Sequence, residues 1–336
     1  MPDDCFEVMA MAGERRQQKK RKVEIGFGQI LIGVIVSVVV VLFSFTTFYE
    51  VQELKVLDER FKLRNWFFGL PYAHPHIAMI EVDDRALEAE GRWQDWTRNK
   101  FAELVDALSQ FRARMVGFDV FFPEPSAKVA MESAAREVLD SRDQISREEV
   151  LQLFNDYDEI FRQSLERAGN VYLGQTFEVV ERDTVFTGVK PRSPEYDERF
   201  KALAPFYRDY PTWEQTRIKR CLDLTAPPLK PHIEAAKGVG FVQTVPDPDG
   251  TRRRYQLVMV YDGKLVPSLA VLMLCDDLRV PFTSLEVVPG EYLRFPNAHM
   301  PDGRVIDLRV PMDEEGRMYV NWVGTSKEGF SRYPHS

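Results

Sequence analysis

A run of 24 residues without a charged side chain, from Ile25 to Phe48, constrains this chain more than any other feature. As a helix it is about 36 Å long, enough to cross a bilayer core of about 30 Å with some tilt. The run is too long for a signal-peptide core, and residues 46–49 (TTFY) do not form a small-residue cleavage pattern. We therefore predict an uncleaved transmembrane helix over residues 25–48. A buried core helix or a β-rich segment is the alternative, because residues 38–41 are all valine.

The distribution of basic residues predicts how this helix is oriented. Residues 10–24 hold six Lys and Arg, whereas residues 49–63 hold three, and the more basic flank normally stays in the cytoplasm. We therefore expect residues 1–24 to form a cytoplasmic tail. The chain then passes once through the lipid bilayer of the inner (cytoplasmic) membrane, and its main domain is periplasmic or extracellular.

Composition limits the partners and cofactors of the chain. It has 336 residues, of which 44% are hydrophobic, so most of it folds. A net charge of −8 argues against a nucleic-acid partner. Five scattered histidines predict neither a metal site nor a cofactor. Cys5 lies in the tail, and the pairing of Cys221 with Cys275 is left open, since an oxidising compartment would permit a disulfide.

Residues 49–69 continue beyond the apolar run without proline. Val51, Leu54, Leu57 and Phe61 share one helical face. We expect either a helical stalk that pairs with a second copy to form a homodimer, or an amphipathic helix that packs on its own domain.

The main domain, residues 70–336, begins with a strand, helix, strand pattern. Apolar strands are expected at 77–82 and 115–122, with a helix over 97–110 between them. Such a unit predicts two parallel strands. Asp83 and Asp84 follow the first strand and can cap the helix that comes next.

The remaining segments complete an α/β pattern. A helix is expected to end near residue 168, followed by a third strand over 171–180. Residues 181–235 lack a clear period and are interpreted as a long insertion. Asp262-Gly263 predicts a hairpin turn, and a helix is expected over 266–278 with Pro267 in its first turn. We thus predict one N-terminal transmembrane helix and a single α/β domain with a mixed, partly parallel sheet flanked by helices.

Eight short motifs occur in order along the chain. They are Leu57 to Arg64, Ile80 to Asp84 with Gly91-Arg92-Trp93, Gly117 to Pro125, Gly169 to Val171, Gly238 to Phe241, Asp247 to Arg253, Pro267 to Ala270, and Tyr319 to Gly324. This series of motifs, which follows one predicted N-terminal membrane span, resembles the type-two member of the CHASE group. These are extracytoplasmic sensor modules attached to bacterial cyclases, histidine kinases and serine/threonine kinases.

The resemblance implies a sensor that perceives an unknown ligand and signals through its membrane helix to a cytoplasmic effector, such as an adenylate or guanylate cyclase or a kinase. No residues here match those catalytic domains, so the chain itself is not expected to be an enzyme. Gln94-Asp95 replaces the proline that usually follows the first tryptophan. Family members also continue into further membrane helices, whereas this sequence ends at Ser336, which implies a fragment or a natural truncation.

Charged and aromatic residues of these motifs are the candidate ligand-binding groups. They are Asp83, Asp84, Arg92, Trp93, Asp119, Asp249, Arg252 and Arg253. The alternative function is a membrane-anchored, metal-dependent phosphoester hydrolase in which Asp83 and Asp119, near the ends of adjacent parallel strands, hold Mg²⁺. Structural roles are the alternative to both the ligand-binding and the hydrolase function. They are a helix cap at Asp83, ion pairs of Asp119 with Arg92 or Arg98, and a turn at residues 247–250.

Overall fold

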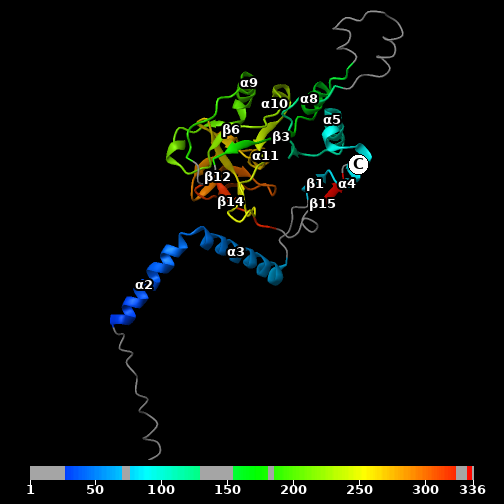
Figure 1. Cartoon of the computed structure of the whole chain (residues 1–336). Helices are drawn as coiled ribbons and strands as arrows, with labels where there is room; N and C mark the ends of the chain where they lie inside the picture. The colour runs from blue at the N-terminus through cyan, green and yellow to red at the C-terminus, as the bar shows by residue number, and fades with distance from the viewer. Residues whose placement is uncertain (1–26, 70–75, 129–153, 181–184, 323–330, 335–336) are drawn as a thin grey trace, which may run out of the picture. The chain divides into compact units, whose positions relative to one another are not determined.

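The computed structural model describes residues 27–69, 76–128, 154–180, 185–322 and 331–334 (Figure 1). The chain divides into two compact units, residues 1–67 and residues 68–336. Three features lie outside the described residues: the predicted cytoplasmic tail, Cys5, and the part before residue 154 of the helix that was expected to end near residue 168.

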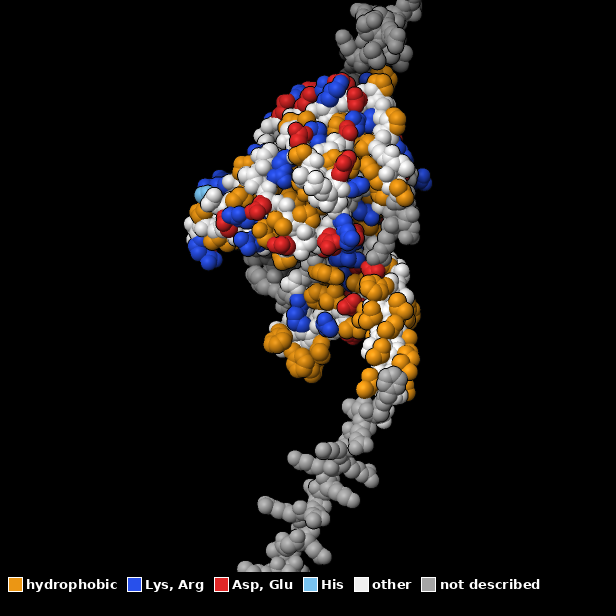
Figure 2. Space-filling model, turned by 90° about the vertical axis from the view of Figure 1, so that its left-hand side faces the viewer, with side chains coloured by type: hydrophobic (Ala, Val, Ile, Leu, Met, Phe, Trp, Pro, Cys, Tyr) orange, Lys and Arg blue, Asp and Glu red, His pale blue; other side chains and the backbone are white. Residues whose placement is uncertain are grey.

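In the described part of the first unit, two helices meet at an elbow. Helix α2 (Phe27–Ser44) is followed by helix α3 (Thr47–Phe68) after a two-residue break, and the two axes differ by 79°. Figure 2 shows hydrophobic side chains along the helix next to the grey N-terminal segment. In the described part of the chain no single helix meets the length and apolarity expected of a membrane span, although the bent pair does so jointly. The prediction of one uninterrupted helix over 25–48 is therefore not confirmed.

Hydroxyl side chains account for this break. Ser44 Oγ donates a hydrogen bond to Val41 O at 2.7 Å, and Thr46 Oγ1 donates one to Phe43 O at 2.7 Å. Thr46 also accepts from the backbone N–H of Tyr49 at 3.3 Å, which is how an N-cap starts a new helix. The first helix therefore ends, and the second begins, within the apolar run.

The centre of the second unit is a three-stranded parallel sheet. Strands β2 (Val116–Phe118), β3 (Val171–Gln175) and β7 (Gly238–Phe241) lie in the order β2-β3-β7. Val116 pairs with Val171, and Leu173 pairs with Val239. Parallel pairing is thus confirmed, but in a three-stranded sheet of its own rather than in one mixed sheet, and β2 is shorter than predicted.

Helices cover both faces of this sheet. Helices α5 (Arg98–Gln110) and α8 (Tyr157–Ala168) share a hydrophobic cluster with Val171 and Leu173 of β3. Tyr172, between those two residues, belongs to a second cluster with helix α11 (Leu269–Asp277). Because successive residues of a strand point to opposite faces, α11 packs on the side opposite α5 and α8.

The first strand of the predicted strand, helix, strand unit has a different partner. Strand β1 (Ala78–Glu81) pairs in parallel with β15 (Ser331–Pro334), whereas β2 pairs with β3. Helix α4 (Asp84–Glu90) and the 3-10 turn η2 (Trp93–Asp95) follow β1. The expectation that the two strands are neighbours in one sheet was wrong for the strands that the structure describes.

The segment predicted as an insertion contributes to the core. It forms helix α9 (Pro194–Leu203), turns η3 (Ala204–Phe206) and η4 (Trp213–Gln215), strands β5 (Arg208–Asp209) and β6 (Cys221–Leu224), and helix α10 (Lys230–Ala235). Leu203, Ile218 and Leu224 are fully buried. Cys221 and Cys275 are both buried and free, and they lie in different hydrophobic clusters, so no disulfide joins them.

Antiparallel strands complete the unit. Their sheets are β4 (Phe177–Val179) with β6; β5, β10 (Lys264–Pro267) and β9 (Val258–Tyr261); β8 (Arg254–Gln256) with β14 (Arg317–Tyr319); and β11 (Glu286–Val288), β12 (Tyr292–His299) and β13 (Val305–Pro311), with turn η5 (Phe282–Ser284) before β11. Asp262 and Gly263 have positive φ, which confirms the hairpin turn. Pro267 ends β10, and Ser268 caps α11, so the helix starts later than predicted.

Candidate functional site

Loops after the three parallel strands meet at one edge of the central sheet. Gln243, after β7, joins the loop after β3: its Nε2 donates to Phe177 O at 2.7 Å, and its Oε1 accepts from Phe177 N and from Thr176 Oγ1. The amide side chain thus continues the pairing of the two strands beyond their ends. In open α/β sheets, this carboxyl edge is where ligands bind.

Asp119 follows β2 at the same edge and is exposed to solvent. Partial burial by its surroundings raises the pKa of its carboxyl group. Its side chain makes no hydrogen bond or ion pair with another described residue. Arg98, one of its two predicted partners, instead lies with its Nε 3.8 Å from Asp158 Oδ1 and donates from Nη2 to Glu124 O at 3.0 Å. The predicted pairing of Asp119 with Arg92 or Arg98 is therefore not formed within the described residues.

Helix α11 starts against the same sheet. A Cβ atom on Gly240 of β7 would lie 2.6 Å from the backbone nitrogen of Leu269, so only glycine permits this approach. Ser268 Oγ accepts from Val271 N at 3.2 Å and caps the helix. Burial raises the pKa of the Tyr255 hydroxyl, and the charge of Asp119 raises it further, whereas hydrogen bonds to Ser268 and Ala270 oppose the shift. Asp119, Tyr255 and the start of α11 are thus neighbours.

A buried arginine–carboxylate network lies in the turn after β7. We use this name for Asp247, Asp249, Arg253 and Arg254. Arg253 donates to both carboxylate oxygens of Asp249 at 2.9 and 2.8 Å, and Arg254 Nε donates to Asp247 Oδ1 at 2.7 Å. The side chains of Arg253 and Asp247 are 4% and 1% exposed. Hydrogen bonds from Arg253 hold the pKa of Asp249 well below its usual value.

The network extends to the neighbouring strand. Asp313 Oδ2 accepts from Arg317 Nε at 2.9 Å and lies 3.8 Å from Arg254 Nη1. Asp313 and Arg317 flank a turn of the form Asp-x-x-Gly-Arg, and residues 247–252 also place an Asp-x-x-Gly turn before arginine. The sequence analysis missed Arg254, Asp313 and Gln243; this repeated turn pattern is the signal that could have identified Asp313.

A histidine cluster holds the loop that follows β2. It consists of Arg98, Asp158 and His232. His232 is fully buried, and its Nε2 lies 3.0 Å from Asp158 O. Asp158 Oδ2 accepts from the backbone of Ser126 at 2.8 Å, which ties the loop to α8. Burial lowers the pKa of His232, with Arg98 and Arg199 acting in the same direction and Asp158 opposing them.

Some of the predicted ligand-binding residues have structural roles, and the others are exposed to solvent. Asp83 caps α4 by accepting from Ala86 N at 3.0 Å, and Asp249 and Arg253 belong to the network. Asp84, Arg92, Trp93, Asp119 and Arg252 are exposed. The structure joins Asp249 with Arg253 and does not join Asp83 with Asp119, whose strands belong to different sheets. No cluster of three acidic, histidine or cysteine side chains in the described ranges has metal-site geometry. The expectation that Asp83 and Asp119 lie at the ends of adjacent strands of one sheet was wrong, because β1 pairs with β15 and β2 pairs with β3.

Comparison with known proteins gives one family. The family model described as CHASE2 domain matches residues 34–335. No curated protein and no solved structure matches the chain.

Proposed function

The chain belongs to the CHASE2 domain family, a family of extracytoplasmic sensor domains, and from that premise we propose that it is the membrane-anchored sensor of a bacterial signalling protein. The observation that carries this proposal is the family match over residues 34–335, which extends from the middle of α2 to the last described strand. The partly parallel α/β fold supports it, because such folds present ligand sites at one sheet edge.

We place the anchor at α2 and the sensory unit outside the cytoplasm. Helix α2 carries no charged residue, and six basic residues precede the apolar run. This pattern supports a cytoplasmic N-terminus and a periplasmic main domain, with α2 and α3 as the connection between them.

The ligand would bind near the carboxyl edge of the parallel sheet, with Asp119 as the first contact. Arg92, Trp93, Asp84 and Arg252 are further exposed groups for recognition, while Asp83, Asp249 and Arg253 position the loops that carry them. Neither Arg92 nor Arg252 is held by an ion pair to another described residue, so each retains its charge for a ligand. These side chains can bind a polar molecule that has both hydrogen-bond donors and hydrogen-bond acceptors.

Signalling requires two arrangements of the sensor with unequal affinity for this ligand. We propose that ligand binding shifts α3 and α2, that two copies associate through these helices, and that a cytoplasmic cyclase or kinase responds. The family match begins at residue 34, inside the first unit, so the match covers both helices and the sensory unit, and this supports the proposed route.

Cysteine labelling in spheroplasts tests the topology with native controls. Cys5 lies in the predicted cytoplasmic tail, and Cys221 and Cys275 are buried. A single added cysteine, Asp302→Cys, would lie in an exposed turn of the sensory unit. A membrane-impermeant maleimide should label this position in intact spheroplasts and Cys5 only after permeabilisation. The reverse pattern, or labelling of both positions only after lysis, would refute the proposed orientation.

A further inference from the structure

Helix α3 has two apolar faces. The face predicted from the sequence, with Val51, Leu54, Leu57 and Phe61, is the less exposed one. The second face consists of Tyr49, Val56, Leu63 and Trp66, which are 38%, 51%, 56% and 77% exposed. We call it the inner face. A helix that contacted only its own domain would show polar residues there.

The inner face points into the elbow between the two helices. The ring of Phe43, on α2, lies 6.1 Å from the ring of Tyr49 and 5.7 Å from that of Phe48. Val56 and Leu63 follow Tyr49 at intervals of seven residues, and positions seven apart lie on nearly the same side of a helix. The apolar face of α3 therefore turns toward the side on which α2 extends.

This arrangement has a direct consequence for a membrane-anchored chain. The bend between α2 and α3 is 79° (Figure 1). With α2 crossing a bilayer, this bend directs α3 nearly along the bilayer surface, and we expect its inner face to lie toward the lipid. We propose that α3 is an interfacial helix whose inner face lies in the headgroup region of a phospholipid bilayer. The inference rests on the proposed anchoring by α2 and adds a lipid contact to it.

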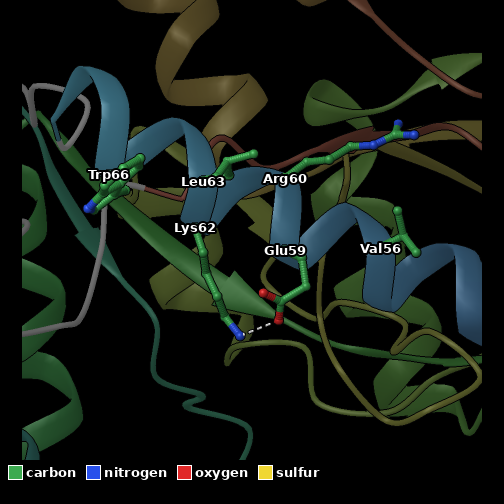
Figure 3. Close-up of a pocket in the computed structure, with 6 residues that line it drawn as sticks. All are labelled: Val56, Glu59, Arg60, Lys62, Leu63 and Trp66. Atoms are coloured by element: carbon green, nitrogen blue, oxygen red, sulfur yellow. Dashed lines mark hydrogen bonds and ion pairs between the residues drawn. The ribbon is translucent and has the colours of Figure 1, made fainter.

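The side chains around the inner face fit this environment. A shallow groove is lined by Val56, Leu63 and Trp66 together with Glu59, Arg60 and Lys62, all from α3 (Figure 3). Glu59 pairs with Lys62 at 2.7 Å, whereas Arg60 extends away from them and has no ion pair with a described residue. An arginine beside an apolar stripe can bind lipid phosphate while its stem covers the stripe. Tyr49 and Trp66 are residue types that prefer the membrane interface.

A second copy of the chain fits the inner face less well. In a two-stranded coiled coil with Val56 and Leu63 at one core position, the other position would hold either Glu59 or Arg60, three or four residues after Val56. Two like charges would then face each other in the seam in either register, which destabilises pairing. At a bilayer surface, Glu59 remains hydrated and paired with Lys62.

Site-directed spin labelling of the full chain in phosphatidylcholine and phosphatidylglycerol vesicles tests the proposal. Single cysteines replace Val56, Leu63 or, as the control on the opposite face, Asp58, in a chain carrying Cys5→Ser. A label at Val36→Cys reports on α2. Nitroxides at residues 56 and 63 should have an oxygen-to-nickel accessibility ratio several-fold above that at residue 58, as for a probe a few ångströms below the headgroups.

Each other result has a distinct meaning. Water-like accessibility at 56 and 63, with lipid-like accessibility at 36, would overturn the interfacial helix and leave the anchor intact. Dipolar broadening at 56 and 63 would assign the inner face to a second copy and also overturn the proposal. Water-like accessibility at 36 would show that the anchoring itself is wrong.

Discussion

Among the described residues of the sensory unit, two buried groups of charged side chains differ in how fully they are paired. In the arginine–carboxylate network, Arg253 and Arg254 are matched by Asp247 and Asp249, and none of their buried polar atoms lacks a hydrogen-bond partner. In the histidine cluster, Arg98 Nε, Asp158 Oδ1 and His232 Nδ1 have no such partner among the described residues. The first is a balanced set of charges, whereas the second is only partly satisfied.

This difference predicts different responses to mutation and to pH. Hydrogen bonds from Arg253 lower the pKa of Asp249 and keep this carboxylate charged throughout the physiological range, so the network should be insensitive to pH there. Burial of a neutral histidine is favourable only while its second ring nitrogen, here Nδ1 of His232, remains unprotonated. The network should therefore dominate the response to mutation, and the cluster should dominate the response to acid.

The largest effect is expected from Asp247→Ala. The substitution leaves Arg254 without its 2.7 Å partner in a site where the aspartate side chain is 1% exposed. Breaking a buried pair on one side costs about 3–5 kcal/mol, so the free energy of unfolding should fall by that amount. Denaturant unfolding of the chain in detergent, followed by tryptophan fluorescence, measures it.

Asp302→Ala is the matched control. Asp302 lies in a comparable turn and pairs with Arg304 at 2.6 Å, but both side chains are at least half exposed. This pair should contribute no measurable stability because solvent screens it. Equal losses for Asp247→Ala and Asp302→Ala would contradict the distinction between buried and exposed pairs.

An intermediate effect is expected from acid, acting through His232. Its folded pKa is lowered by burial, so below the ordinary value of about 6.5 the unfolded chain binds a proton that the folded chain does not. Stability should therefore fall as the pH decreases from about 6.5, by at most about 1.4 kcal/mol per pH unit. His232→Gln, whose amide can still donate to Asp158 O, should remove this dependence.

The comparison is between denaturant midpoints at about pH 7.5 and about pH 5.5. His299→Gln is the control, because His299 is exposed and its replacement should leave the acid sensitivity of the chain unchanged. If His232→Gln is as acid-sensitive as the parent chain, the histidine cluster does not determine the response.

Features set by neighbouring residues could be predicted from the sequence. The Asp262-Gly263 turn, the cap at Asp83 and the end of α8 at Gly169 depend on contacts within a few residues. The parallel sheet was also predicted, because its strands are apolar runs separated by helices. The break after Ser44 also had a local signal, in the hydroxyl groups of Ser44 and Thr46, which the sequence analysis did not use.

Features that depend on distant residues could not be predicted. The partner of β1 is β15, which begins at Ser331, and nothing in the sequence of either strand specifies the other. Asp119 has four arginines within 28 residues before it in the chain, yet Arg98 lies against Asp158 instead. Likewise, Asp313 and Arg254 meet only because β14 pairs with β8. Charge complementarity in sequence permits many pairings, and the fold selects among them.

The smallest effect on stability is expected from Asp119→Asn. Burial raises the folded pKa of this carboxyl group, so its charged form is slightly unfavourable in the folded chain above the ordinary value of 3.8. The neutral amide should change stability by less than about 0.5 kcal/mol, with any gain present at neutral pH and lost as the pH falls below 3.8, where the carboxyl becomes protonated in both states. Denaturant midpoints at neutral pH and below pH 3.8 measure this. A loss comparable to that of Asp247→Ala would show that Asp119 belongs to a paired structural group rather than to an open sheet edge available to a ligand.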